Sequence, residues 1–178
     1  MPETALPARP RGTLSLRWAP VLTAALIGAG STAAAPPKPS FDPVTFFTGA
    51  TESSGTLKQA FSSAKATHGM GRGAMRGGGE FELDQTMTVA GDSKVQTRQW
   101  KLHEISPGHF GGTISDGKGP VTIDVAGNRM LIRYTMLNGM KVESVLTIDP
   151  SGRSGHNVST VRKWGMGVAN LNETIVKR

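Results

Sequence analysis

Residues 94–112 read KVQTRQWKLHEISPGHFGG, and this stretch decides the fold. One run of residues with strand character leads to Pro107 and Gly108, and a second run opens with His109 and Phe110. Proline followed by glycine supplies the backbone angles of a tight turn, so the stretch predicts a β-hairpin. Short strands and glycine-rich turns of the same kind recur along most of the chain.

Apolar and polar residues alternate in several of these runs. Phe81, Leu83 and Met87 share one face of a strand, while Glu82 and Asp84 share the other. One buried face and one wet face are typical of an antiparallel sheet. The predicted strands cover residues 54–62, 66–76, 80–89, 94–105, 109–116, 119–126, 129–137, 140–149, 156–164 and 168–177.

Tight turns join these strands in sequence, and Asn138-Gly139 is the strongest of them. A long up-and-down meander hides its edges by closing on itself. The predicted fold class is therefore all-β, an antiparallel up-and-down, lipocalin-like β-barrel of about eight to ten strands. A short helical turn is expected at residues 44–49, with Phe46 and Phe47 as a plug against the end of the barrel. A two-sheet sandwich is the alternative, although hairpins joined in sequence suit a meander better than a Greek key.

The N-terminal residues 1–34 have the pattern of a cleaved signal peptide. Three arginines precede an apolar run at residues 18–30, and small residues follow it. The run is shorter than the ~20 residues that span a bilayer, so cleavage after Ala33 or Ala34 is favoured over an uncleaved anchor. We therefore expect a periplasmic or secreted protein.

The remainder of the chain is expected to hold one domain. Residues 35–43 are rich in proline and predict a linker, and residues 44–178 then form the barrel. The chain carries 20 basic and 13 acidic residues, a net charge of +7, but the basic residues come singly and the aromatic residues are few. Nucleic acid is therefore not an expected partner.

The chain has no cysteine. This excludes disulfides, thiolate catalysis and the lipid-modified cysteine that tethers lipoproteins, so membrane association would need another route. The four histidines are scattered, and neither a zinc-binding HExxH motif nor a hydrolase GxSxG motif is present. No catalytic residue, metal ligand or cofactor is predicted.

Glycines alternate along residues 68–79, which read HGMGRGAMRGGG. The spacing fits no phosphate-binding loop. Instead Gly69, Gly71 and Gly73 fall on one face of a strand, which predicts a bend or a place where another backbone packs closely.

Several motifs in the chain resemble those of one exported bacterial family, the domain of unknown function 3833 family. They are FFTG at 46–49, GTLKQAF at 55–61, LDQTM at 83–87, RQW at 98–100, PGHFGG at 107–112, GPV at 119–121, RY at 133–134 and RKWGMGVANLNETI at 162–175. The resemblance covers nearly the whole chain after the signal peptide. It implies a lipocalin-like barrel and no established activity. Many members of this family resemble lipoproteins, whereas this chain lacks the lipid-bearing cysteine.

Charged residues on apolar strand faces mark the candidate site. Arg98 shares a predicted face with Trp100, Arg162 shares one with Trp164, and Glu173 lies in register with neighbouring apolar residues. A charge inside a barrel must be paired. One interpretation is a structural latch, with arginines bridged to Glu173 and stacked on indole rings. The other is an anchor for the acidic head of an amphipathic ligand. The candidate ligand-binding residues are Arg98, Trp100, Arg133, Tyr134, Arg162, Trp164 and Glu173.

The expected function is that of a binding protein, a lipocalin-like carrier of a lipid or another hydrophobic or amphipathic small molecule, because small barrels either fill with side chains or enclose one ligand. One alternative is a structural envelope protein that binds a protein partner through its basic surface. The other is an enzyme whose open end carries Arg98, Arg133, His103 and Glu104. That alternative lacks a nucleophile, a metal set and a carboxylate pair.

Overall fold

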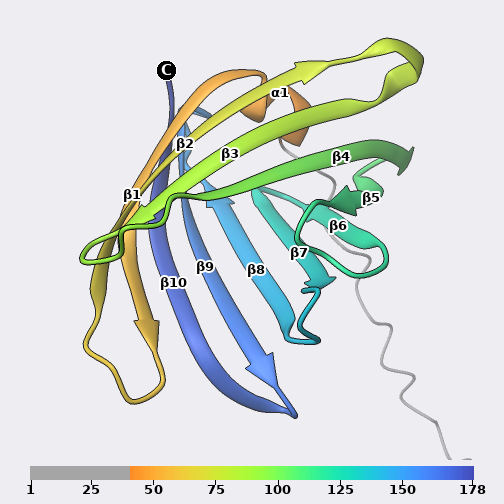
Figure 1. Cartoon of the computed structure of the whole chain (residues 1–178). Helices are drawn as coiled ribbons and strands as arrows, with labels where there is room; N and C mark the ends of the chain where they lie inside the picture. Colours follow the sequence, from red (N-terminus) through yellow and green to blue (C-terminus); the bar gives the residue numbers. More distant parts are fainter. Residues whose placement is uncertain (1–40) are drawn as a thin grey trace, which may run out of the picture. The chain divides into compact units, whose positions relative to one another are not determined.

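The computed structural model describes residues 41–178. The predicted signal peptide and most of the predicted linker lie outside the described residues. Within them, the chain forms one short helix, a single 3-10 turn and ten strands (Figure 1). The elements are α1 (Pro43–Phe47), β1 (Gly49–Gln59), β2 (Lys65–Met75), η1 (Gly77–Gly79), β3 (Phe81–Val89), β4 (Gln96–Ser106), β5 (His109–Ile114), β6 (Val121–Ala126), β7 (Arg129–Thr135), β8 (Lys141–Ile148), β9 (Ser154–Lys163) and β10 (Met166–Lys177).

The ten strands form one closed antiparallel barrel, as the sequence predicted. Each strand pairs with the next one along the chain, and β1 pairs with β10 from Thr51↔Lys177 to Gln59↔Ala169. The sandwich alternative is therefore wrong. The hairpin at 94–112 consists of β4 and β5 with an irregularity between Glu104 and Ser106.

The helix α1 lies at one end of the barrel, called here the helix end (Figure 1). The carboxylate of Asp42 accepts hydrogen bonds from the backbone N–H groups of Val44 and Thr45, and Pro43 occupies the first turn, so the start of the helix is capped. Phe46 and Phe47 pack edge to face with their ring centroids 4.9 Å apart, and both are buried against the barrel core. The predicted helical turn and its aromatic plug are confirmed.

The inner face of β2 carries Gly69, Gly71 and Gly73, all buried. A methyl group added at Gly73 would lie under 3.0 Å from the backbone carbonyl oxygen of Phe47, so the glycine lets α1 approach the sheet. The predicted close backbone approach is confirmed there. At the other two glycines, the same methyl group would meet side-chain oxygens of the neighbouring strand β1. The part of the wall formed by Thr51, Ser53, Gly69 and Gly71 therefore has only short side chains.

The apolar core comes mainly from β3 to β8. Met130, Leu146 and Val121 are its largest fully buried side chains. Within residues 41–178, no helix has the length and apolar character needed to cross a bilayer.

Candidate functional site

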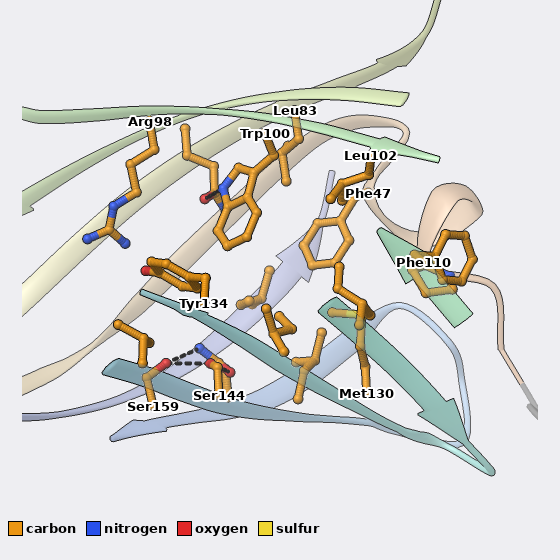
Figure 2. A pocket seen from close by; sticks show the side chains of 18 of the residues that line it. Phe47, Leu83, Arg98, Trp100, Leu102, Phe110, Met130, Tyr134, Ser144 and Ser159 are labelled. Atoms are coloured by element: carbon orange, nitrogen blue, oxygen red, sulfur yellow. Dashed lines mark hydrogen bonds between the residues drawn. The ribbon is translucent and has the colours of Figure 1, made fainter. Parts of the chain in front are cut away.

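A cavity of about 100 Å³ lies inside the barrel. Its lining changes from apolar to polar across its width. Figure 2 shows Phe47, Phe110 and Met130 on one side of the cavity and Arg98 and Tyr134 on the other. A lining of this kind suits a molecule with an apolar part and a polar part, because each part meets side chains of its own character.

The guanidinium of Arg98 is the cationic group of this cavity. Strand β4 directs it inward, and its Nε donates a hydrogen bond to Oδ2 of Asp116 over 2.8 Å. Asp116 follows β5, the neighbour of β4 in the sheet, which brings its carboxylate within reach. Among residues 41–178, no group accepts a hydrogen bond from the two terminal nitrogens of Arg98. Those nitrogens remain available to a ligand.

Trp100 and Tyr134 form the aromatic part of the lining. The indole Nε1 of Trp100 donates to Oε1 of Gln85 over 2.6 Å, and its ring meets that of Tyr134 edge to face at 5.6 Å between centroids. Burial raises the pKa of the Tyr134 phenol above its ordinary value of 10.0, while Arg98 opposes the shift. The hydroxyl is therefore neutral at physiological pH, and it makes no hydrogen bond with the described part of the chain.

Four polar side chains on β8, β9 and β10 form a connected network. The hydroxyl of Ser144 donates to Oδ1 of Asn157 over 2.8 Å, and Nδ2 of Asn157 donates to Oε1 of Glu173 over 2.9 Å and to the hydroxyl of Ser159 over 3.2 Å. The two serine hydroxyls also bond to each other, with Ser159 as donor because Ser144 has one proton. Every proton of the network is therefore used, while Oε2 of Glu173 accepts no hydrogen bond from residues 41–178.

The latch interpretation, in which arginines form a bridge to Glu173, is wrong. Within residues 41–178, Glu173 forms no ion pair with an arginine and accepts from Asn157 instead. Arg98 is paired with Asp116 instead, which follows the neighbouring strand β5. Arg98 and Glu173 nevertheless line the same cavity.

Two predicted site residues on β9 and its turn lie outside the barrel. Val161 packs against the core, so the next residue, Arg162, faces outward. Trp164 is 85% exposed, because Trp164 and Gly165 form the two-residue turn between β9 and β10. Their φ angles are 51° and 82°, the pattern of a type I′ turn. The strand alternation that placed Trp164 on an inner face ends before it.

Arg133 also faces outward. It pairs with Asp124 at 3.2 Å and with Glu143 at 3.3 Å on the outer surface. Adjacent residues in a strand point to opposite faces, so Arg133 could not join Tyr134 inside the barrel.

The residues of the enzyme alternative do not converge. His103 and Glu104 lie on β4 near its turn to β5, at the helix end, whereas Arg98 faces the cavity. The carboxylate of Glu104 accepts a hydrogen bond from the backbone N–H of Gly108 over 3.1 Å and thereby supports the turn. In residues 41–178, no cluster of three or more histidine or acidic residues could hold a metal ion.

Five residues of the site were not predicted: Gln85, Asp116, Ser144, Asn157 and Ser159. Gln85 and Ser144 carry a readable signal, because each interrupts an apolar row on an inward face. Asp116 lies in a turn, where no alternation indicates its direction.

A family model matches residues 23–177 of the chain, and its description reads "Protein of unknown function (DUF3833)". The chain belongs to this family. A search of curated proteins gave no match to this DUF3833 protein.

One solved structure shares the fold, and others show a weaker likeness. The S-type phycobiliprotein lyase CPES from Guillardia theta superposes with a TM-score of 0.61 at 8% sequence identity, over 76% of this chain and 90% of the lyase chain. A redesigned β-barrel, mFAP0, bound to DFHBI, gives a TM-score of 0.43 at 14% identity, over 74% of this chain and 99% of the designed one. At these identities the likeness concerns the fold of the DUF3833 protein alone.

Proposed function

We propose that the barrel binds one amphipathic small molecule, with an apolar part in the cavity and a polar head beside Arg98. One observation carries the proposal. The cavity combines an apolar lining with hydrogen-bonding groups that the described part of the chain does not use itself: the terminal nitrogens of Arg98, the Tyr134 hydroxyl and Oε2 of Glu173. Polar groups that the chain leaves free inside a mostly apolar cavity are of the kind that orients a bound ligand.

The cavity limits the size of the enclosed part. Its volume of about 100 Å³ is of the order of the ~150 Å³ that holds benzene in an engineered apolar cavity. A second cavity of about 60 Å³ shares Gln85, Arg98 and Glu173 with the first and reaches the short side chains of β1 and β2. We therefore propose a ligand whose enclosed part is a single ring or a short chain, with its head near the shared residues.

The charges around the cavity favour a ligand whose polar head both accepts and donates hydrogen bonds. Arg98 supplies hydrogen-bond donors, but its charge is already paired with Asp116, and Glu173 places a carboxylate in the lining. A lone anion would meet the carboxylate of Glu173 and an arginine whose charge Asp116 already partly neutralises. A hydroxyl, amide or zwitterionic head satisfies both Arg98 and Glu173.

Native mass spectrometry of the protein purified from its own host tests the proposal. We expect a retained small molecule, and a chain that begins at Ala34 or Ala35 if the proposed export and cleavage take place. Replacing Arg98 with leucine removes the donors and should lower the retained fraction about tenfold or more, since a hydrogen bond to a charged group contributes roughly 1.5–3 kcal/mol.

The matched control is Arg133→Leu, which removes an outward arginine and should leave the retained fraction unchanged. Circular dichroism must show that both variants are folded. An empty barrel in the native protein, or equal retention in both variants, would contradict the proposed function.

A further inference from the structure

The end of the barrel opposite α1 carries large exposed apolar side chains. Five hairpin turns form this end, called here the rim: β1–β2, β3–β4, β5–β6, β7–β8 and β9–β10. Figure 1 shows the β1–β2, β7–β8 and β9–β10 turns away from α1. The exposed residues in or beside these turns are Phe61, Val95, Leu137, Trp164 and Met166. Exposed apolar residues that gather at one end of a fold indicate a contact site, whereas single scattered ones need no explanation.

Phe61 and Trp164 have a second unusual property. In residues 41–178 they are the only residues other than glycine with positive φ, at 62° and 51°. Bulky side chains disfavour this conformation, and strained positions of this kind gather at functional sites. Both side chains are exposed, at 108% and 85%, so packing within the fold does not compensate for the strain.

The two aromatic residues stand on neighbouring hairpins. Strand β1 pairs with β10, and beyond the ladder the backbone N–H of Ala60 donates to the carbonyl of Val168 over 2.8 Å. The β1–β2 and β9–β10 turns therefore lie side by side. The ammonium of Lys163 lies 4.7 Å from the centroid of the Trp164 ring.

The rim is strongly basic. Its turns and their flanking residues carry Lys58, Lys65, Lys94, Lys118, Lys141, Arg162 and Lys163, against Asp92 and Asp116. Both aspartates are already paired, with Lys65 and Arg98 respectively. At the helix end, by contrast, Asp42, Glu80, Glu104 and Asp149 accompany the basic residues. The excess of positive charge is thus larger at the rim, the end that carries the exposed aromatic residues, than at the helix end.

We propose that the rim docks on the surface of a bilayer that contains anionic phospholipid. Tryptophan and phenylalanine insert at the interface between headgroups and acyl chains, and lysines beside them are attracted to anionic headgroups. Phe61 and Trp164 would be the inserted residues, and Lys163 and Lys118 would lie at the headgroup level. This surface is separate from the interior cavity, and it does not depend on whether the cavity holds a ligand.

The test is co-sedimentation of the full protein with vesicles, using the double variant Phe61→Asn/Trp164→Asn. Asparagine tolerates positive φ, and Asn-Gly is a favoured type I′ turn, so this variant should melt at the same or a higher temperature. We expect binding to phosphatidylcholine vesicles with about 30% phosphatidylglycerol, weak binding to phosphatidylcholine alone, and about a tenfold loss of binding in the variant.

Two controls make the result specific. Ile105→Ser removes an apolar residue that is 69% exposed near the helix end, and it should leave binding unchanged. Every variant keeps the same N-terminus, so a contribution from that segment cancels in the comparison. Raising the salt from about 0.05 to about 0.5 M should weaken binding.

Fluorescence locates the contact. The part of the emission that is lost in Trp164→Phe should shift to shorter wavelength when the anionic vesicles are added to the native protein. The proposal is overturned if the double variant binds as well as the native protein, if both kinds of vesicle bind equally, or if neither binds.

Discussion

Tyr134 is the one tyrosine of the chain, so a tyrosine titration reports on the cavity alone. Burial raises its pKa, which means that the folded state holds the phenolic proton more tightly than the unfolded state does. Its contribution to the free energy of unfolding is therefore fully present below the ordinary value of 10.0. It is lost as the pH rises through the raised pKa.

Ultraviolet absorbance of the phenolate gives the pKa directly, and denaturant unfolding at a series of alkaline pH values gives the stability. We expect a titration midpoint above that of the unfolded protein, and a fall in stability above pH 10 that Tyr134→Phe reduces. A midpoint equal to that of the unfolded chain would show that the hydroxyl is solvated.

Individual residues of the site were predictable where alternation was unbroken. Arg98, Trp100 and Glu173 lie in strands and face the cavity as expected. The predicted inward direction of Trp164 was wrong, because a turn follows Lys163. The direction of a side chain in a turn cannot be inferred from strand alternation. The partner of Arg98 lies in a loop and depends on how β5 ends, which no local pattern specifies.

At the scale of elements, the contact between β2 and α1 gives a second prediction. Gly73→Ala places a methyl group against the backbone of Phe47 and the ring of Phe81. The backbone of Phe47 belongs to α1, so the methyl group fits only if the helix moves. We expect a loss of about 1–3 kcal/mol in the free energy of unfolding, the usual range for overpacking.

Gly77→Ala is the matched control. Gly77 lies in the 3-10 turn η1 with a negative φ and with nothing within 4 Å of an added methyl group. This change should be neutral or slightly stabilising. Chemical denaturation measures the free energy of unfolding of both variants. An equal stability for the two would mean that α1 does not pack against β2.

Most strands were predicted to within a few residues, because several, such as β3, β6 and β8, have an apolar inner face and tight turns limit the others. Strand β1 is the exception, since it begins at Gly49 and not near residue 54. Its inner residues Thr51 and Ser53 are polar or small, so the alternation of burial is not an alternation of hydropathy. The same small residues create the space next to Arg98, and the sequence pattern was least informative where the cavity begins.

For the whole molecule, closure has a measurable consequence. A closed barrel has no edge strand, so the amides of β1 and β10 should be as protected from hydrogen exchange as those of β8 and β9. Exchange measured by mass spectrometry or NMR would show this, with the 90–95 turn as a rapidly exchanging reference. Free exchange of alternate amides along β1 would indicate an open sheet.

Closure itself could be predicted, because tight turns between ten successive strands leave only the two edges to pair. The cavity could not, because its volume depends on how side chains from opposite walls meet. Phe110 and Met130, for example, come from β5 and β7 and approach Phe47 of α1.

The seam between β1 and β10 also sets the order of events in the making of the protein. A chain that emerges from its N-terminus has all of β1 available long before Met166–Lys177 has been synthesised. Until then β1 keeps one row of backbone donors and acceptors unpaired, a template to which other chains could add. Residues Met166–Lys177 close the barrel, so a truncation before Met166 would leave an exposed sheet edge on β1 where the native protein has none.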